Sequence, residues 1–102
     1  MLELRPTCEH CNTPLRPNST EAMICTFECT FCKSCVENII HNVCPNCGGG
    51  FTPRPIRPYT AWVPKVSLSQ YPATTKVTHK LVNQEEHSML VSTVAAIPPE
   101  ER

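Results

Sequence analysis

The sequence predicts a small α+β fold stabilised by metal ions, and three observations lead to this prediction. All eight cysteines lie in the first half of the 102-residue chain, in four close pairs. A β-prone segment precedes the third pair, and an apolar stripe of helical period follows it. The cysteine-rich half spans about 50 residues, a size at which the burial of apolar surface alone gives only marginal stability.

The cysteine pairs have the spacing of zinc ligands. Three pairs are C-x2-C and one is C-x3-C, and 13, 2 and 8 residues separate successive pairs. A C-x2-C knuckle brings two thiolates onto one turn, and two knuckles complete a tetrahedral Zn²⁺ site. Four pairs therefore predict two four-cysteine sites and two Zn²⁺ ions. The predicted ligands are Cys8, Cys11, Cys25, Cys29, Cys32, Cys35, Cys44 and Cys47.

Structural zinc is expected to supply much of the folding free energy. Its binding contributes an apparent ~10–16 kcal/mol, which becomes folding free energy when the unfolded chain has no site. We therefore expect residues 8–47 to be unfolded without metal.

Disulfides are the alternative use of eight cysteines. They require an oxidising compartment, and residues 1–6 lack the basic region and apolar run of a signal peptide. No stretch approaches the ~18 apolar residues of a membrane span. We therefore expect a cytoplasmic protein with reduced cysteines and no membrane association.

The formal net charge is zero, but the two halves of the chain differ. Residues 1–50 carry three Lys/Arg against five Glu, and residues 51–102 carry six against four. Zn²⁺ bound by four thiolates leaves two net negative charges at each site. The loaded first half is thus expected to be acidic, which disfavours nucleic-acid binding because phosphate contacts need positive charge.

Three segments are expected along the chain. Residues 1–51 form the two-zinc unit, called here the cysteine module. Residues 52–82 form a proline-rich, basic and extended strap. Residues 83–102 form a C-terminal helix and tail, with Asn83 and Glu86 as a capping pair and a narrow apolar stripe. That stripe consists of Leu90, Val94 and Ile97.

Within the cysteine module, residues 22–28 are apolar and β-prone and predict a short hairpin. A helix is expected after Cys32, with Ser34 and Glu37 as its capping box. It must end by Cys44, because Pro45 disfavours helical geometry in the residue before it. Residues 48–50 are the only glycines, and they permit positive φ and bring backbone N–H groups to the sulfurs. The helical stripe consists of Val36, Ile39, Ile40 and Val43.

Residues 51–84 contain five basic residues and no acidic one, with Tyr59, Trp62 and Tyr71 among them. One interpretation is a contact for single-stranded nucleic acid, in which bases stack on the aromatic rings. The other is a strap that lies over the acidic cysteine module. The basic residues are too sparse for a nucleic-acid patch, which favours the strap.

Two pairings of the cysteines are physically reasonable. In sequential pairing, the first two pairs hold one ion and the last two hold the other. In interleaved pairing, Cys8, Cys11, Cys32 and Cys35 hold one ion, and Cys25, Cys29, Cys44 and Cys47 hold the other. A helix that leaves Cys35 at one ion and returns at Cys44 to another fits the interleaved form, which we favour.

Residues 8–47 resemble a RING finger in its all-cysteine form. The matching features are the order of the pairs, Phe31 before Cys32, the short helix, and the C-P-N-C knuckle at residues 44–47. The resemblance implies a cross-braced, treble-clef-like fold and a groove for a ubiquitin-conjugating enzyme. Pro45 and Ile39 or Ile40 match that groove. The first knuckle carries Glu9-His10 in place of an aliphatic residue, and Gly48 stands where a basic residue is common, which disfavours ligase activity.

The whole chain is also similar to a bacterial family of short cysteine-rich proteins known as a domain of unknown function. The likeness lies in the opening Met-Leu-Glu-Leu-Arg-Pro, the Cys-Pro-Asn-Cys-Gly-Gly run and the Ile-Pro-Pro-Glu near the end. It implies no particular function, and a bacterial host argues further against ubiquitin transfer.

Other chemistry is less well supported. His10 and His41 lie near the ligands and are expected at the surface or behind the ligands, and His79 and His87 have no expected role. A [4Fe–4S] cluster would use Cys29, Cys32 and Cys35, but the fourth cysteine follows after eight residues in place of three.

The sequence contains no catalytic constellation, which favours a non-enzymatic protein. The predicted function is recognition of an unidentified protein partner by a module with structural zinc. The alternatives are a ubiquitin-ligase-type component, a nucleic-acid binder and an iron–sulfur redox protein. The sequence does not predict an oligomeric state.

Overall fold

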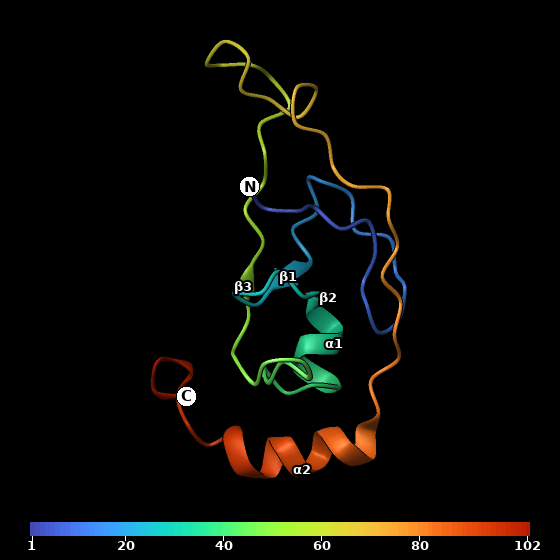
Figure 1. Ribbon diagram of the computed structural model, residues 1–102, viewed down its shortest axis with the longest axis vertical. Helices are drawn as coiled ribbons and strands as arrows, with labels where there is room; N and C mark the ends of the chain where they lie inside the picture. The colour runs from blue at the N-terminus through green and yellow to red at the C-terminus, as the bar shows by residue number, and fades with distance from the viewer.

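A three-stranded antiparallel sheet and a short helix form the centre of the molecule (Figure 1). The computed structural model describes residues 1–102. Strand β1 (Ala22–Ile24) pairs on one edge with β2 (Thr30–Cys32) and on the other with β3 (Thr52–Pro53). Helix α1 (Lys33–Asn38) follows β2 directly. The hairpin expected near residues 22–28 is confirmed as β1–β2, and its second strand begins later, at Thr30.

Cysteines make up half of the hydrophobic core. The core cluster contains twelve buried residues, of which six are cysteines. Phe31 of β2 packs edge-to-face on Phe51, with ring centroids 5.5 Å apart and an interplanar angle of 86°. Few other large side chains are available, so the packing of this core depends on the state of its thiols.

Helix α1 is shorter than its apolar stripe predicts. It ends at Asn38, and His41 and Asn42 adopt left-handed backbone angles with φ of 51° and 58°. Asn42 donates its backbone N–H to Val36 O, which closes a turn and stops the helix. Ile40 and Val43 are fully buried as expected, but from this turn and not from a helix face.

The predicted capping box at Ser34 is wrong. The N-cap residue is Cys32, and no side chain caps the helix. Because β2 runs to Cys32 and leads into α1 without a loop, Ser34 falls inside the helix. There its hydroxyl accepts a hydrogen bond from Asn38 Nδ2 at 3.4 Å.

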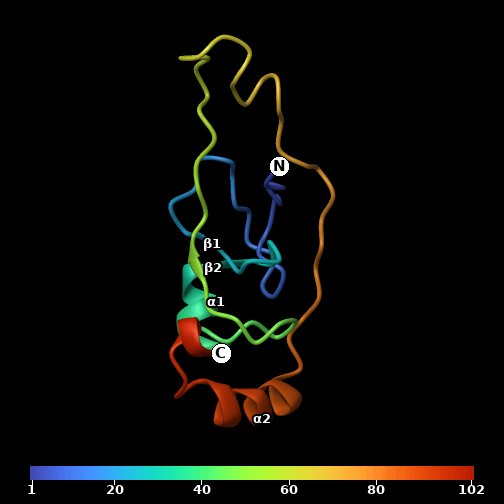
Figure 2. The ribbon, with the colours of Figure 1, turned by 60° about the vertical axis from the view of Figure 1, so that its left-hand side comes forward.

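The strap, residues 52–82, begins with β3, turns at one end of the long molecular axis, and returns along the other side to α2 (Figures 1 and 2). Helix α2 (Gln84–Val94) lies at the opposite end and is followed by the 3₁₀ turn η1 (Pro99–Glu101). The Asn83 side chain accepts hydrogen bonds from the backbone N–H groups of Glu85 and Glu86, which confirms Asn83 as the predicted N-cap, whereas the Glu86 side chain does not bond back to Asn83. None of the helices is both long and apolar enough to cross a bilayer.

The strap contacts the cysteine module mainly through hydrogen bonds to backbone groups. Arg54 is buried and donates to the carbonyl oxygens of residues 5, 15 and 16. Arg57 donates to Leu2 O at 2.7 Å and to Tyr71 O at 2.6 Å. On the returning side, Lys80 N donates to Glu9 O and Val82 N to His10 Nδ1. The expected strap is present, but its arginines donate hydrogen bonds to backbone carbonyl oxygens and not to acidic side chains.

Candidate metal centre

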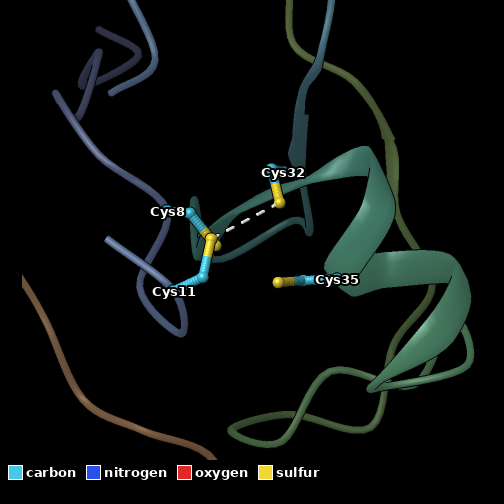
Figure 3. A group of neighbouring side chains, drawn as sticks. All are labelled: Cys8, Cys11, Cys32 and Cys35. Atoms are coloured by element: carbon cyan, nitrogen blue, oxygen red, sulfur yellow. Dashed lines mark hydrogen bonds between the residues drawn. The ribbon is translucent and has the colours of Figure 1, made fainter. Parts of the chain in front are cut away.

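The first group of sulfurs combines the first and third cysteine pairs. The Sγ atoms of Cys8, Cys11, Cys32 and Cys35 all lie within 4.8 Å of one another. Figure 3 shows the four side chains directed toward a common point, with Cys11 Sγ and Cys32 Sγ 3.7 Å apart. Two come from the first knuckle, one from the end of β2 and one from the first turn of α1.

Local backbone bonds shape the first knuckle. Cys8 N donates to Thr13 O and Asn12 N donates to Cys8 O, each at 2.9 Å. Asn12 has a φ of 61°, a left-handed angle that asparagine tolerates better than most residues. This tight turn places Cys8 and Cys11 on the same side, facing β2 and α1.

The second group contains Cys25, Cys44 and Cys47, whose Sγ atoms also lie within 4.8 Å of one another. Cys25 Sγ and Cys44 Sγ are 3.8 Å apart. Gly48 has a φ of 76°, and Gly49 N donates a hydrogen bond to Cys47 Sγ at 3.4 Å. The role expected for these glycines, positive φ and an N–H directed at sulfur, is confirmed.

Cys29 lies beside the second group but outside the 4.8 Å set. It is buried, its carbonyl accepts from Cys25 N at 3.2 Å, and its sulfur accepts from Asn46 Nδ2 at 3.4 Å. Glu28 before it has a φ of 66°, so the chain makes a sharp turn between Cys25 and Cys29. Seven of the eight predicted ligands thus form two groups, and the eighth lies across the same knuckle from Cys25.

The sulfur spacing matches four ligands around one ion. A Zn–S bond of about 2.3 Å gives a tetrahedron with edges of about 3.8 Å, close to the two sulfur separations above. A disulfide would bring two sulfurs to about 2.05 Å, and all eight cysteines are free. The grouping is interleaved, since the first pair meets the third and the second meets the fourth.

The metal-free thiols have strongly perturbed acidities. Burial raises the pKa of Cys35 and Cys32, and the negative charge of Cys8 raises both further. Burial likewise raises the pKa of Cys44 and Cys29. These four buried thiols resist ionisation because each thiolate would be desolvated beside other sulfurs. A divalent cation reverses this preference, and the thiolate is the form that binds it.

Cys11 differs from its neighbours. Partial burial raises the pKa of Cys11, but hydrogen bonds with Thr13, Cys8 and Cys32 outweigh that effect and lower the pKa to about 6. The Thr13 hydroxyl lies 3.0 Å from Cys11 Sγ. The first group therefore holds one thiol that ionises readily, Cys11, and two with raised pKa, Cys32 and Cys35.

Two polar residues near the knuckles have structural roles that the sequence did not indicate. His87, given no expected role, is buried in α2, and its Nε2 lies 2.8 Å from Val43 O. Glu9 is buried in the first knuckle and accepts hydrogen bonds from Arg5 at 2.8 Å and from Thr30 N. His87 lies three residues before Leu90 on the apolar stripe of α2, a signal that could have identified it.

The fold and its two sulfur groups define a small, cysteine-rich α+β protein whose cysteines are compatible with metal binding. The chain belongs to the family described as protein of unknown function DUF1272, whose profile matches residues 1–57 and so includes all eight cysteines. It is 52% identical over 75 residues to the uncharacterized protein R02474 of Rhizobium meliloti (strain 1021), a match that covers 74% of this chain and 82% of that protein. No solved structure matches the chain.

Proposed function

We propose that this protein binds two structural Zn²⁺ ions and acts by recognising another protein, without catalysis. The observation that carries the proposal is the sulfur geometry: four Sγ atoms within 4.8 Å of one another in one group and three in the other. Thiolate sulfurs in tetrahedral sets favour zinc or iron. One ion takes Cys8, Cys11, Cys32 and Cys35, and the other takes Cys25, Cys44, Cys47 and Cys29.

Cys29 completes the second site in this proposal. Its backbone is hydrogen-bonded to Cys25, so its sulfur belongs to the same turn as a member of the second group, and Asn46 Nδ2 already donates to that sulfur. A structural zinc site is almost always four-coordinate, which favours this ligand over water.

Mononuclear metal sites fit better than iron–sulfur clusters. In a four-iron cluster each cysteine binds a different iron, which spreads the sulfurs further apart than ligands that share one ion. The short sulfur separations of both groups favour a single ion in each. A tetrathiolate iron site has the same geometry as zinc, so the test below distinguishes the two metals.

Recognition through a RING-type groove is disfavoured by the contacts of α2 and the strap. Pro45, the groove residue of the RING resemblance, faces Val82 and Leu90 across a cavity of about 450 Å³. Glu9, at the first-knuckle position of that groove, is turned inward to Arg5. The chain's own segments therefore stand where a conjugating enzyme would approach, which favours a different partner and a different surface.

A cytoplasmic location is part of the same proposal. All eight cysteines are free, and thiolate metal sites persist where the surroundings keep cysteines reduced.

Native mass spectrometry beside visible absorption spectroscopy tests the metal assignment. The expected result is two zinc ions per chain with no visible band, followed by the visible ligand-field absorption of tetrahedral Co²⁺ after exchange for that ion. Iron with visible absorption in the protein as purified would overturn the assignment in favour of redox chemistry. A metal-free mass reduced by pairs of hydrogens would overturn it in favour of disulfides.

A further inference from the structure

An exposed group of aromatic and aliphatic side chains occupies the far end of the strap. Residues 56–73, called here the tip loop, project beyond the cysteine module along the 47 Å axis of the molecule (Figures 1 and 2). Trp62 is 82% exposed and Tyr59 is 86% exposed, the highest values among the aromatic residues. The exposed apolar side chains of the loop are Ile56, Tyr59, Trp62, Val63, Val66 and Tyr71.

The tip loop has a defined internal structure. Val63 and Val66 form an isolated β-bridge, and Val66 N donates to Val63 O at 3.1 Å across the turn. At the base, Leu68 N donates to Pro58 O at 2.8 Å, and Ser67 is buried. The exposed side chains are therefore presented on a closed loop, which reduces the conformational entropy lost when a surface binds it.

The charge around the tip is positive. No acidic residue occurs between residues 51 and 84. Lys65 lies in the turn between the two bridged valines, with a φ of 67°. Its side chain takes part in no ion pair, whereas Arg57 is held by two carbonyl oxygens.

These features discriminate among the surfaces that the tip loop could contact. Single-stranded nucleic acid needs several basic groups along its backbone, and Arg54 and Arg57 are engaged within the fold. The aliphatic side chains beside Trp62 have no role in base stacking. A lipid interface accommodates the aromatic, aliphatic and lysine side chains of the tip loop. Trp and Tyr lie at the headgroups, aliphatic groups enter the acyl boundary, and lysine attracts anionic lipid.

We propose that the tip loop contacts the surface of an anionic lipid bilayer, with Trp62, Val63 and Val66 inserted at the interface and Lys65 at the headgroups. A convex loop at the end of the molecule reaches a flat surface without interference from α2, which lies at the opposite end. The contact is peripheral and adds a function to metal binding, on which it does not depend. It departs from the expectation of no membrane association, which rested on the absence of a spanning segment.

Trp62 is the only tryptophan, so its fluorescence reports on the tip loop alone. The zinc-loaded full chain is mixed with vesicles of phosphatidylcholine alone or with phosphatidylglycerol added, and its metal content is measured in the same sample. The expected result is a blue shift of Trp62 emission and cosedimentation with the anionic vesicles only. High salt should weaken both, since lysine contributes through electrostatic attraction.

Three variants distinguish vesicle binding by the tip loop from non-specific adhesion of other exposed apolar side chains. Lys65→Gln should weaken binding to anionic vesicles about fivefold, the equivalent of one basic residue near the surface. Trp62→Ser should abolish cosedimentation. The matched control is Met89→Gln, which removes an exposed apolar side chain from α2 and should bind like the parent chain.

Several outcomes would overturn the proposal. They are the absence of a shift with any vesicle, unchanged cosedimentation of Trp62→Ser, and a loss with Met89→Gln as large as that with Trp62→Ser. A shift that rises with protein concentration without lipid would instead assign the surface to a second copy of the chain. A shift with a single-stranded oligonucleotide and none with vesicles would assign it to nucleic acid.

Discussion

His87 Nε2 lies 2.8 Å from the carbonyl oxygen of Val43, a bond that ties α2 to the residue directly before Cys44. Both residues are buried, although 44 positions separate them in the chain. The C-terminal helix is thus fixed to the knuckle that carries two of the three sulfurs of the second group, Cys44 and Cys47. Substitutions in α2 can therefore affect a site to which the helix gives no ligand.

His87→Leu should destabilise the zinc-loaded protein by about 1–3 kcal/mol, because it leaves the buried Val43 carbonyl without a donor while it keeps much of the volume. Urea unfolding at a fixed free zinc concentration measures the loss. His79→Leu is the control, since His79 is exposed where its ring meets His10 O. Equal decreases in the free energy of unfolding of the two variants would show that the hydrogen bond to Val43 does not stabilise the protein more than the exposed contact of His79.

Arg54→Met should destabilise the protein by about 3 kcal/mol, because it removes a buried guanidinium and leaves its carbonyl partners unpaired. Lys76→Met, at an exposed position of the same strap, should change the free energy of unfolding little. Hydrogen exchange should also rise in the loop around Leu15, whose carbonyl Arg54 contacts. Unchanged exchange there would contradict the role assigned to Arg54.

Two double substitutions distinguish the pairings of the cysteines. Cys8→Ser with Cys32→Ser removes two ligands of one interleaved site, so one zinc ion should remain. Cys8→Ser with Cys25→Ser removes one ligand from each interleaved site and should impair both. Native mass spectrometry counts the ions, and sequential pairing predicts the reverse pattern.

The pH dependence of zinc binding at the first site should steepen below about pH 6. Only thiolates bind the ion, so affinity falls as protons return to the ligands. Cys32 and Cys35, whose pKa values are raised, already release protons on binding at neutral pH. Cys11, with its pKa lowered to about 6, adds a further proton only when the pH falls below that value.

Competition with a chelator across pH 5–8 measures this effect. Thr13→Val removes the hydroxyl that stabilises the Cys11 thiolate, so the steeper region should move to higher pH. Thr20→Val, in the same loop but exposed and away from the sulfurs, should leave the profile unchanged. A profile of Thr13→Val identical to that of the parent chain would exclude the proposed role of Thr13.

Sequence patterns predicted the features whose conformation depends on one short segment of the chain. The hairpin, the Asn83 cap and the turn at Gly48 each depend on neighbouring residues, and all three are confirmed. The predicted helix is longer than α1 because apolar residues at helical spacing indicate which side chains are buried and do not determine the backbone angles. Ile40 and Val43 are buried from a left-handed turn, a conformation that periodicity cannot distinguish from helix.

Contacts between distant segments could not be predicted in the same way. The carbonyl oxygens that receive Arg54 lie nearly 50 and 40 residues away, and no pattern in the sequence marks a carbonyl as an acceptor. Cysteine pairs were the exception, because metal-ligand chemistry constrains spacing over long distances. The position of Cys29 outside the second sulfur group shows the limit of that constraint.

Strand β2 joins the two proposed metal sites, since Cys29, the proposed fourth ligand of the second site, directly precedes it and Cys32 ends it. An ion at either site anchors one end of the same three-residue strand and closes a large loop of the unfolded chain. The second ion then binds a chain that has already lost much of that entropy. Metal loading should therefore be positively cooperative, so that limiting zinc yields a mixture of empty and doubly loaded molecules with few singly loaded ones.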